Sequence, residues 1–176
     1  ISEYKSIFMY EYLHRVLGRI IVVIFLIPFL FFYFTNRIKK NLTPKLGAIF
    51  ILGGLQGLLG WYMVKSGLVN NPAVSQYRLT AHLGNAVIIY SYILWVAFGL
   101  IEEMREPLVK LSINISQGIK ITAYTITALL FLMILSGGMV AGTRAGLAYS
   151  TFPLMGETFI PPGLYNMSPF WLSAFE

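Results

Sequence analysis

Two histidines are the residues of this sequence best suited to chemistry, and the chain contains no others. His14 lies just before the first of four long apolar blocks, and His82 lies near the start of the third. If each block crosses a bilayer, both histidines lie at similar depth on the same side. Two imidazoles at equal depth on different helices suit axial ligation of a haem iron. The alternative is that each histidine is an interfacial polar residue that anchors a helix end.

A carboxylate accompanies the first histidine. Glu11 precedes His14 by three residues, so in a helix both side chains project from the same face. A carboxylate in that place can orient the imidazole, or act as a base on something bound to the metal. Glu11 also precedes Arg15 by four residues, and an ordinary Glu–Arg pair that caps the helix is the competing interpretation.

Three arginines stand close to the histidines in sequence: Arg15, Arg19 and Arg78. A guanidinium group matches a carboxylate in bidentate fashion, so arginines beside a haem can hold its propionates. Their side chains could equally snorkel to the lipid headgroups. The chain has no cysteine, which excludes disulfides, thiolate metal sites and cysteine nucleophiles.

The elements that position these residues must be membrane helices. Of the 176 residues 57% are hydrophobic and 11% charged, whereas soluble domains carry roughly 25% charged residues. This excludes a soluble globular domain and disorder. We predict an all-α integral membrane protein with four spans, over about 16–34, 46–64, 79–100 and 119–140. The net charge of +6 does not indicate nucleic-acid binding, because the basic residues lie between the apolar blocks.

The distribution of Lys and Arg predicts how the chain crosses the membrane. Basic residues are concentrated after the first and third spans, so these two loops are expected to lie inside. The N-terminal segment, the second loop and residues 143–176 are then outside, together with both histidines. The loop residues that carry this prediction are Arg37, Lys39, Lys40, Lys45, Arg105, Lys110 and Lys120.

The second span carries a stripe of small residues. Gly53, Gly57 and Gly60 recur every three or four positions, so they share one face of a helix. Such a stripe allows close approach of another helix, or of a flat ligand. Both interpretations fit the spacing.

Four segments of the chain resemble the haem A synthase family. Residues 11–19 read EYLHRVLGR and are similar to its Glu-x-x-His-Arg-x-x-Gly-Arg signature. Residues 56–68 (QGLLGWYMVKSGL) resemble the following helix and its exit, and residues 75–83 (SQYRLTAHL) the segment with the second haem ligand. Residues 145–156 (AGLAYSTFPLMG) resemble the loop between the family's two halves. The likeness is greatest to the branch shared by mitochondria and alphaproteobacteria.

The resemblance implies a fold of eight transmembrane helices in two four-helix bundles, each binding one haem between two histidines. This chain would correspond to helices two to five. Residues 1–142 would hold the N-terminal-half helices and the first helix of the second half, and 143–176 an outer loop. Because the sequence begins at Ile1 rather than Met, we expect an excerpt of a longer protein or the product of a split or decayed gene.

Family members oxidise the C8 methyl group of haem O to a formyl group, giving haem A for cytochrome c oxidase. The resemblance therefore implies that His14 and His82 are the axial ligands of the substrate haem and that Glu11 is catalytic. It implies that Arg15, Arg19 and Arg78 bind the cofactor, with a haem b in the other half.

The resemblance also implies partners and a location. The expected partners are a haem O synthase as supplier, an electron donor such as ferredoxin, the lipid bilayer and a second copy of the chain, with no nucleic acid. The expected location is a bacterial cell membrane or the mitochondrial inner membrane. One alternative function is a bis-histidine membrane cytochrome that only carries electrons, for which Glu11 is not required. Another is a helical membrane protein, transporter-like or purely structural, without a cofactor.

Overall fold

A computed structural model describes residues 2–67, 75–104, 115–148, 151 and 153–160 of the chain, with side chains from residue 8 onward. It contains five helices in this part of the chain: α1 (Ser2–Phe34), α2 (Thr43–Gly67), α3 (Gln76–Met104), α4 (Gln117–Thr143) and the short α5 (Ala145–Ala148). The only extended pairing found there is an isolated bridge between Met155 and Thr158. The predicted all-α class is confirmed.

Four of these helices are long and apolar enough to cross a membrane, which confirms the integral, multi-pass prediction. The apolar stretches are Phe8–Phe34, Thr43–Lys65, Gln76–Met104 and Gln117–Thr143. Each of the four helices begins before the span predicted for it, and α2, α3 and α4 also end after it, whereas α1 ends at Phe34, as predicted. The reason is that a hydropathy pattern marks the hydrocarbon zone, whereas the backbone hydrogen bonds of a helix continue into the headgroup region. The largest extension is at the start of α1, which places Glu11 and His14 within the helix.

The helix ends are set by local signals. The first helix continues unbroken through Pro28 and stops where Asn36 adopts a left-handed conformation, with φ 54°. There the amide of Arg37 donates to the Phe32 carbonyl (2.9 Å) and the amide of Asn36 to the Tyr33 carbonyl (3.1 Å). These two bonds satisfy carbonyls that a helix end leaves open, as in a Schellman motif.

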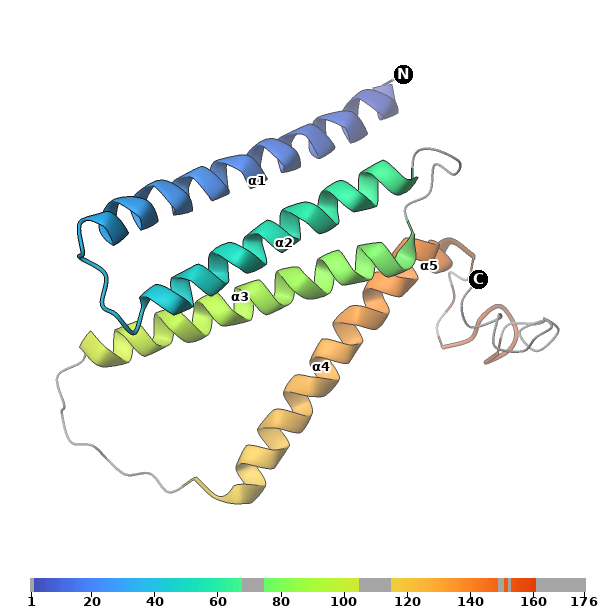
Figure 1. The fold of residues 1–176 in the computed structure, drawn as a ribbon. Coiled ribbons are helices and arrows are strands. Elements are labelled where there is room, and N and C mark those ends of the chain that lie inside the picture. The colour runs from blue at the N-terminus through green and yellow to red at the C-terminus, as the bar shows by residue number, and fades with distance from the viewer. Residues whose placement is uncertain (1, 68–74, 105–114, 149–150, 152, 161–176) are drawn as a thin grey trace.

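The third helix is the centre of the assembly. It packs most extensively against α4 and then α2, whereas α1 makes only a small contact with α2. Figure 1 shows α1, α2 and α3 running side by side in alternating directions. The end of α4 crosses the start of α3, whereas the beginning of α4 lies away from the other helices.

The crossing of α3 and α4 depends on two glycines of α4. A Cβ atom on Gly142 would lie 2.5 Å from the Gln76 Cα, and one on Gly138 would lie 3.2 Å from the Thr80 Cα. Both distances are shorter than a carbon–carbon contact of about 3.5–4.0 Å, so only glycine permits this approach. Small residues have the same function in many membrane helix pairs.

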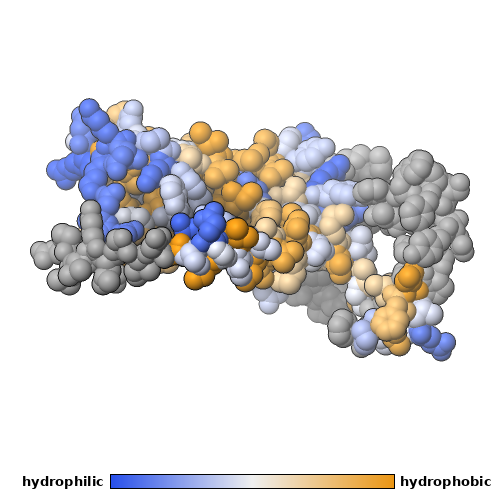
Figure 2. Space-filling view, turned by 90° about the horizontal axis from the view of Figure 1, so that it is seen from below, coloured by the Kyte–Doolittle hydropathy of each residue, from blue (hydrophilic) through white to orange (hydrophobic). Residues whose placement is uncertain are grey.

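The outer surface of the helices is apolar. In the described part of the chain, Val96 is the only buried large hydrophobic residue, and most Leu, Ile and Phe side chains are exposed. Hydrophobic residues form a broad zone across the middle of the surface in Figure 2, and hydrophilic residues are concentrated toward one end. This pattern is what a bilayer requires, since lipid tails solvate apolar side chains.

The turn after α1 and the end of α3 lie at the same end of the molecule. The Lys39 Nζ donates to the Glu103 carboxylate at 2.8 Å, and the Lys45 Nζ lies 4.9 Å from the centre of the Trp95 ring. The loops predicted to lie inside therefore begin on one side of the bundle. Arg105 and Lys110, and most of the outer loop expected over 143–176, lie outside the described residues.

Candidate functional site

His82 is the best enclosed of the ionisable side chains singled out above. It lies on α3, half-buried against α2, with its Nε2 atom 3.3 Å from the Gln56 Nε2. A Cβ atom on Gly60 would lie 3.1 Å from the His82 Cε1, so the ring rests directly over this glycine. Its other nitrogen, Nδ1, is buried and has no hydrogen-bond partner among the described residues.

Two amide side chains extend this contact between the helices. Asn85 is buried on α3 at 8% exposure, and its Nδ2 donates to the Gln56 Oε1 at 2.8 Å. The same Nδ2 donates to the backbone carbonyl of Leu52 at 3.3 Å. Neither amide was predicted from the sequence to belong to the site. The available signal was their type, because an amide in an apolar span needs a partner within the protein.

His14 lies on α1, and its side chain is exposed. Both histidines lie toward the starts of their helices, and Figure 1 shows the starts of α1 and α3 at the same end of the bundle. The two helices that carry them are separated in sequence by the whole of α2. Their common location at one end of the bundle is therefore confirmed, while ligation of iron by both stays a prediction.

Glu11 and Arg15 form an ion pair on the surface of α1. The Arg15 Nη2 donates to the Glu11 Oε2 at 3.2 Å, and the two side chains are 49% and 60% exposed, respectively. This is the Glu–Arg pair that the spacing predicted. An exposed pair of this kind contributes little to stability. Because the Glu11 side chain is exposed, its carboxylate is accessible for another function.

The other two arginines lie at the same end of their helices as the histidines. Arg19 is exposed on α1, one turn after Arg15. Arg78 is half-buried on α3, one turn before His82, and its guanidinium stacks 4.7 Å from the centre of the Tyr62 ring on α2. Stacking on an aromatic ring holds the plane of the guanidinium. The interaction of these arginines with propionates stays a prediction.

The glycine stripe of α2 divides into two parts. Gly60 accommodates the His82 ring, whereas a Cβ atom on Gly53 or Gly57 would have nothing within 4 Å. Helix packing therefore explains Gly60 and does not explain the other two. The sparse contact between α1 and α2 leaves this part of the stripe uncovered by protein in the described residues.

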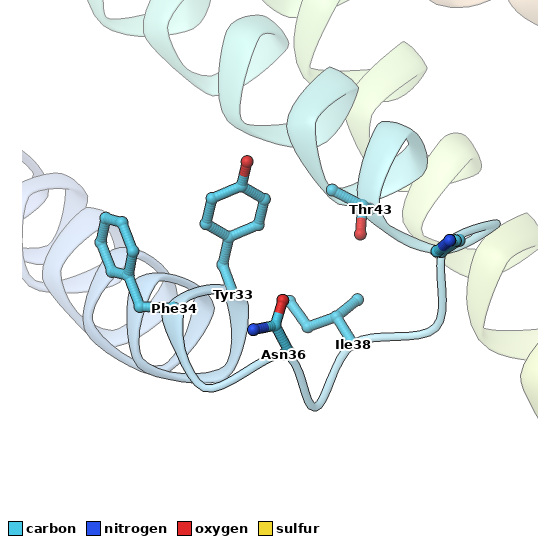
Figure 3. Close-up of a pocket in the computed structure, with 6 residues that line it drawn as sticks. Tyr33, Phe34, Asn36, Ile38 and Thr43 are labelled. Atoms are coloured by element: carbon cyan, nitrogen blue, oxygen red, sulfur yellow. The ribbon is translucent and has the colours of Figure 1, made fainter.

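No three His, Cys, Asp and Glu side chains gather in the described residues as a site for a bare metal ion. A haem iron makes a smaller demand, since two protein ligands complete its coordination. A hollow at the turn between α1 and α2 is lined by Tyr33, Phe34, Asn36, Ile38, Lys40 and Thr43 (Figure 3). It lies at the opposite end of α1 from His14, so it is separate from the histidine site.

Comparison with known proteins gives one consistent family. Residues 1–176 match the family model COX15-CtaA, described as cytochrome oxidase assembly protein. The heme A synthases of Nitrosospira multiformis and Nitrosomonas eutropha are 52% and 50% identical to the chain over its full length. That of Parvibaculum lavamentivorans is 46% identical, also over the full length. Because the alignment covers 49% of each relative, the chain spans about half the length of the curated relatives it matches. No solved structure matches.

Proposed function

Because this chain belongs to the COX15-CtaA family of cytochrome oxidase assembly proteins, we propose that it acts in haem A biosynthesis as a haem A synthase. The proposed reaction oxidises the C8 methyl group of haem O, the substrate, to the formyl group of haem A. Relatives that carry the name heme A synthase are up to 52% identical and align with the whole chain, which supports this assignment.

The observation that carries the proposal is the common location of His14 and His82 at one end of the bundle. They come from the starts of α1 and α3, which run in the same direction with α2 between them (Figure 1). Two imidazoles from different helices are a sufficient protein ligand set for a haem iron. We propose that these two histidines hold the iron of haem O.

The residues around the histidines fit a haem. The His82 Nδ1 is buried and has no hydrogen-bond partner among the described residues, so this nitrogen is not engaged by any of them. The open glycines Gly53 and Gly57 leave room beside α2 for a flat group. When bound, the haem supplies both the iron and the methyl group at which the oxidation takes place.

We assign Glu11 to proton transfer at the edge of this site. It stands three residues before His14 on α1, so both side chains project from one face of the helix. Methyl oxidation requires protons to be delivered or removed, and Glu11 is the only carboxylate near either histidine in sequence. Arg15 holds this carboxylate at 3.2 Å.

We assign the propionate groups of the haem to the arginines Arg15, Arg19 and Arg78. Arg78 supports this best, because its stacking on Tyr62 fixes the guanidinium one turn from His82. A guanidinium held in place beside the histidine suits the carboxylate of a propionate in charge and shape.

Haem O is strongly apolar, so we propose that a haem O synthase delivers it through the bilayer and that a ferredoxin-like protein donates electrons. Self-association of the chain belongs to the same proposal.

A second candidate function is a bis-histidine cytochrome that only carries electrons. The exposed ion pair favours it, since the Arg15 contact gives Glu11 a structural role without catalysis. The two functions differ in the fate of haem O, which a cytochrome leaves unoxidised.

The test is replacement of His14 or His82 by Ala in the full-length protein, purified in detergent with bound haem. We expect each variant to lose the haem bound by this half of the protein, together with its low-spin absorption, while the haem b expected in the other half stays bound. The matched control is Ile88→Ala, which truncates a 47% exposed side chain on α3 away from the histidines. Unchanged haem content and spectrum in either histidine variant would refute the proposal.

A further inference from the structure

The polar contacts between α2 and α3 form a chain with a fixed direction. It begins at the Leu52 carbonyl, which can only accept a hydrogen bond. The Asn85 atom 3.3 Å from this oxygen must therefore be the amide nitrogen. The same nitrogen then donates its second hydrogen to Gln56 at 2.8 Å, so the Gln56 atom in this contact must be its oxygen.

This assignment decides what Gln56 offers to His82. With its oxygen accepting from Asn85, the amide group of Gln56 turns its nitrogen toward the His82 ring, at 3.3 Å. An amide nitrogen only donates, so the ring nitrogen that faces it must carry the lone pair. In a neutral imidazole the proton then resides on the other nitrogen, Nδ1.

The packing keeps the ring in this position. Leu52, Gln56 and Gly60 are spaced by four residues, so they form one row along α2. Asn85 follows His82 by three residues on α3 and shares its face. Gly60 has no side chain and so leaves room for the ring, whose Cε1 lies 3.1 Å from the place of a Cβ atom. If the ring turned, its Nε2 would move away from Gln56 and the contact between them would be lost.

We propose that Gln56 and Asn85 are positioning residues that hold His82 in the tautomer with its lone pair on Nε2, before any haem is bound. This is the tautomer in which Nε2 can ligate iron. The inference rests on the proposed function in one respect, since it gives the tautomer a purpose only if His82 binds the haem. A haem iron bound at Nε2 would use the same lone pair, so the Gln56 N–H would then give up its hydrogen bond to the ring.

The experiment measures the tautomer directly in full-length, haem-free protein labelled with nitrogen-15 in histidine. The signals of His82 are those that disappear in the His82→Ala variant. We expect the chemical shifts of a protonated Nδ1 and an unprotonated Nε2. A protonated Nε2 in the unmodified protein would overturn the inference, and the His82→Ala variant serves only to assign the signals.

The decisive variant is Gln56→Glu, which keeps the shape and the bond from Asn85 but presents an acceptor to His82. We expect a proton on the His82 Nε2 and haem binding weaker by about 10–100-fold, the usual effect of changing a residue behind a metal ligand. The control Gln56→Met removes the donor without supplying an acceptor, so Nε2 is not held protonated and haem binding falls less than in Gln56→Glu.

The failure of the inference is distinguishable from that of the proposed function. If Gln56→Glu leaves the tautomer unchanged while His82→Ala abolishes haem binding in this half of the protein, only the inference fails. If His82→Ala keeps the full haem content of the unmodified protein, the proposed ligand set fails, whereas the tautomer measurement is unaffected because no haem is present.

Discussion

Substitution of Gly60 by Ala tests whether α2 fixes the position of His82. The new methyl carbon would lie 3.1 Å from the His82 Cε1. Carbon atoms in contact prefer about 3.5–4.0 Å, so the ring must move away by about 0.4–0.9 Å, which is 3.5 or 4.0 minus 3.1. The bond to Gln56 is already long at 3.3 Å, and such a shift would break it.

The consequence for activity follows from the size of this displacement. A misplacement of about 1 Å in a reacting group can cost about 100-fold in rate. We therefore expect Gly60→Ala to lower the rate of haem A formation by about 10–100-fold and to shift the haem absorption spectrum. The assay is chromatography of haems O and A, and of the alcohol intermediate, extracted from cells that contain the full-length variant.

The matched control is Gly54→Ala on the same helix, where a Cβ atom has nothing within 4 Å. Both substitutions gain the same helix propensity, about 0.8–1.0 kcal/mol in soluble hosts, so a difference between them reports on the contact with His82. Equal haem content, spectrum and haem A yield in the two variants would refute the view that α2 positions the histidine.

Three further predictions concern protons, propionates and packing. Glu11→Gln should spare haem O binding and stop formation of haem A, as chromatography of extracted haems would reveal; a normal haem A yield would leave Glu11 only its structural pairing role. Gly142→Ala should lower the free energy of unfolding in detergent by about 1–3 kcal/mol, because the new Cβ atom would lie 2.5 Å from the Gln76 backbone. The control is Gly137→Ala, where a Cβ atom has nothing within 4 Å, and equal melting temperatures for the two variants would contradict the prediction. Reversal of the charge at each proposed propionate partner should reduce the amount of haem retained through purification; the variants are Arg15→Glu, Arg19→Glu and Arg78→Glu. Full retention of haem in all three would indicate that these side chains snorkel to the headgroups instead.

The divergence of α4 from α3 leaves much of α4 exposed. The residues of α4 before Phe131 are all exposed. Beyond them Phe131 and Leu135 lie beside Gly84 of α3, and Gly142 makes the closest approach to the α3 backbone. This close approach is why the Gly142 variant is expected to affect stability.

The sequence by itself determined the membrane-spanning helices and their number. Long apolar blocks can satisfy their backbone groups in a bilayer only as helices, so the four spans followed from composition and length. The sequence also determined local geometry on a single helix. The spacing of Glu11 and Arg15 predicted their ion pair, and the even number of crossings between His14 and His82 predicted that they share one end of the bundle.

Only the tertiary structure decided which faces of the helices meet. In water the apolar stripe of a helix identifies its buried face, but in a bilayer lipid and protein are equally apolar, and that signal is lost. The partners of His82 are therefore invisible to sequence periodicity. Gln56 lies 26 residues before it on another helix, and Asn85 contacts Gln56 across 29 residues. Their hydrogen bonds exist because the axial offset of α2 against α3 brings the amides to the same depth, and packing at small residues such as Gly60 sets that offset.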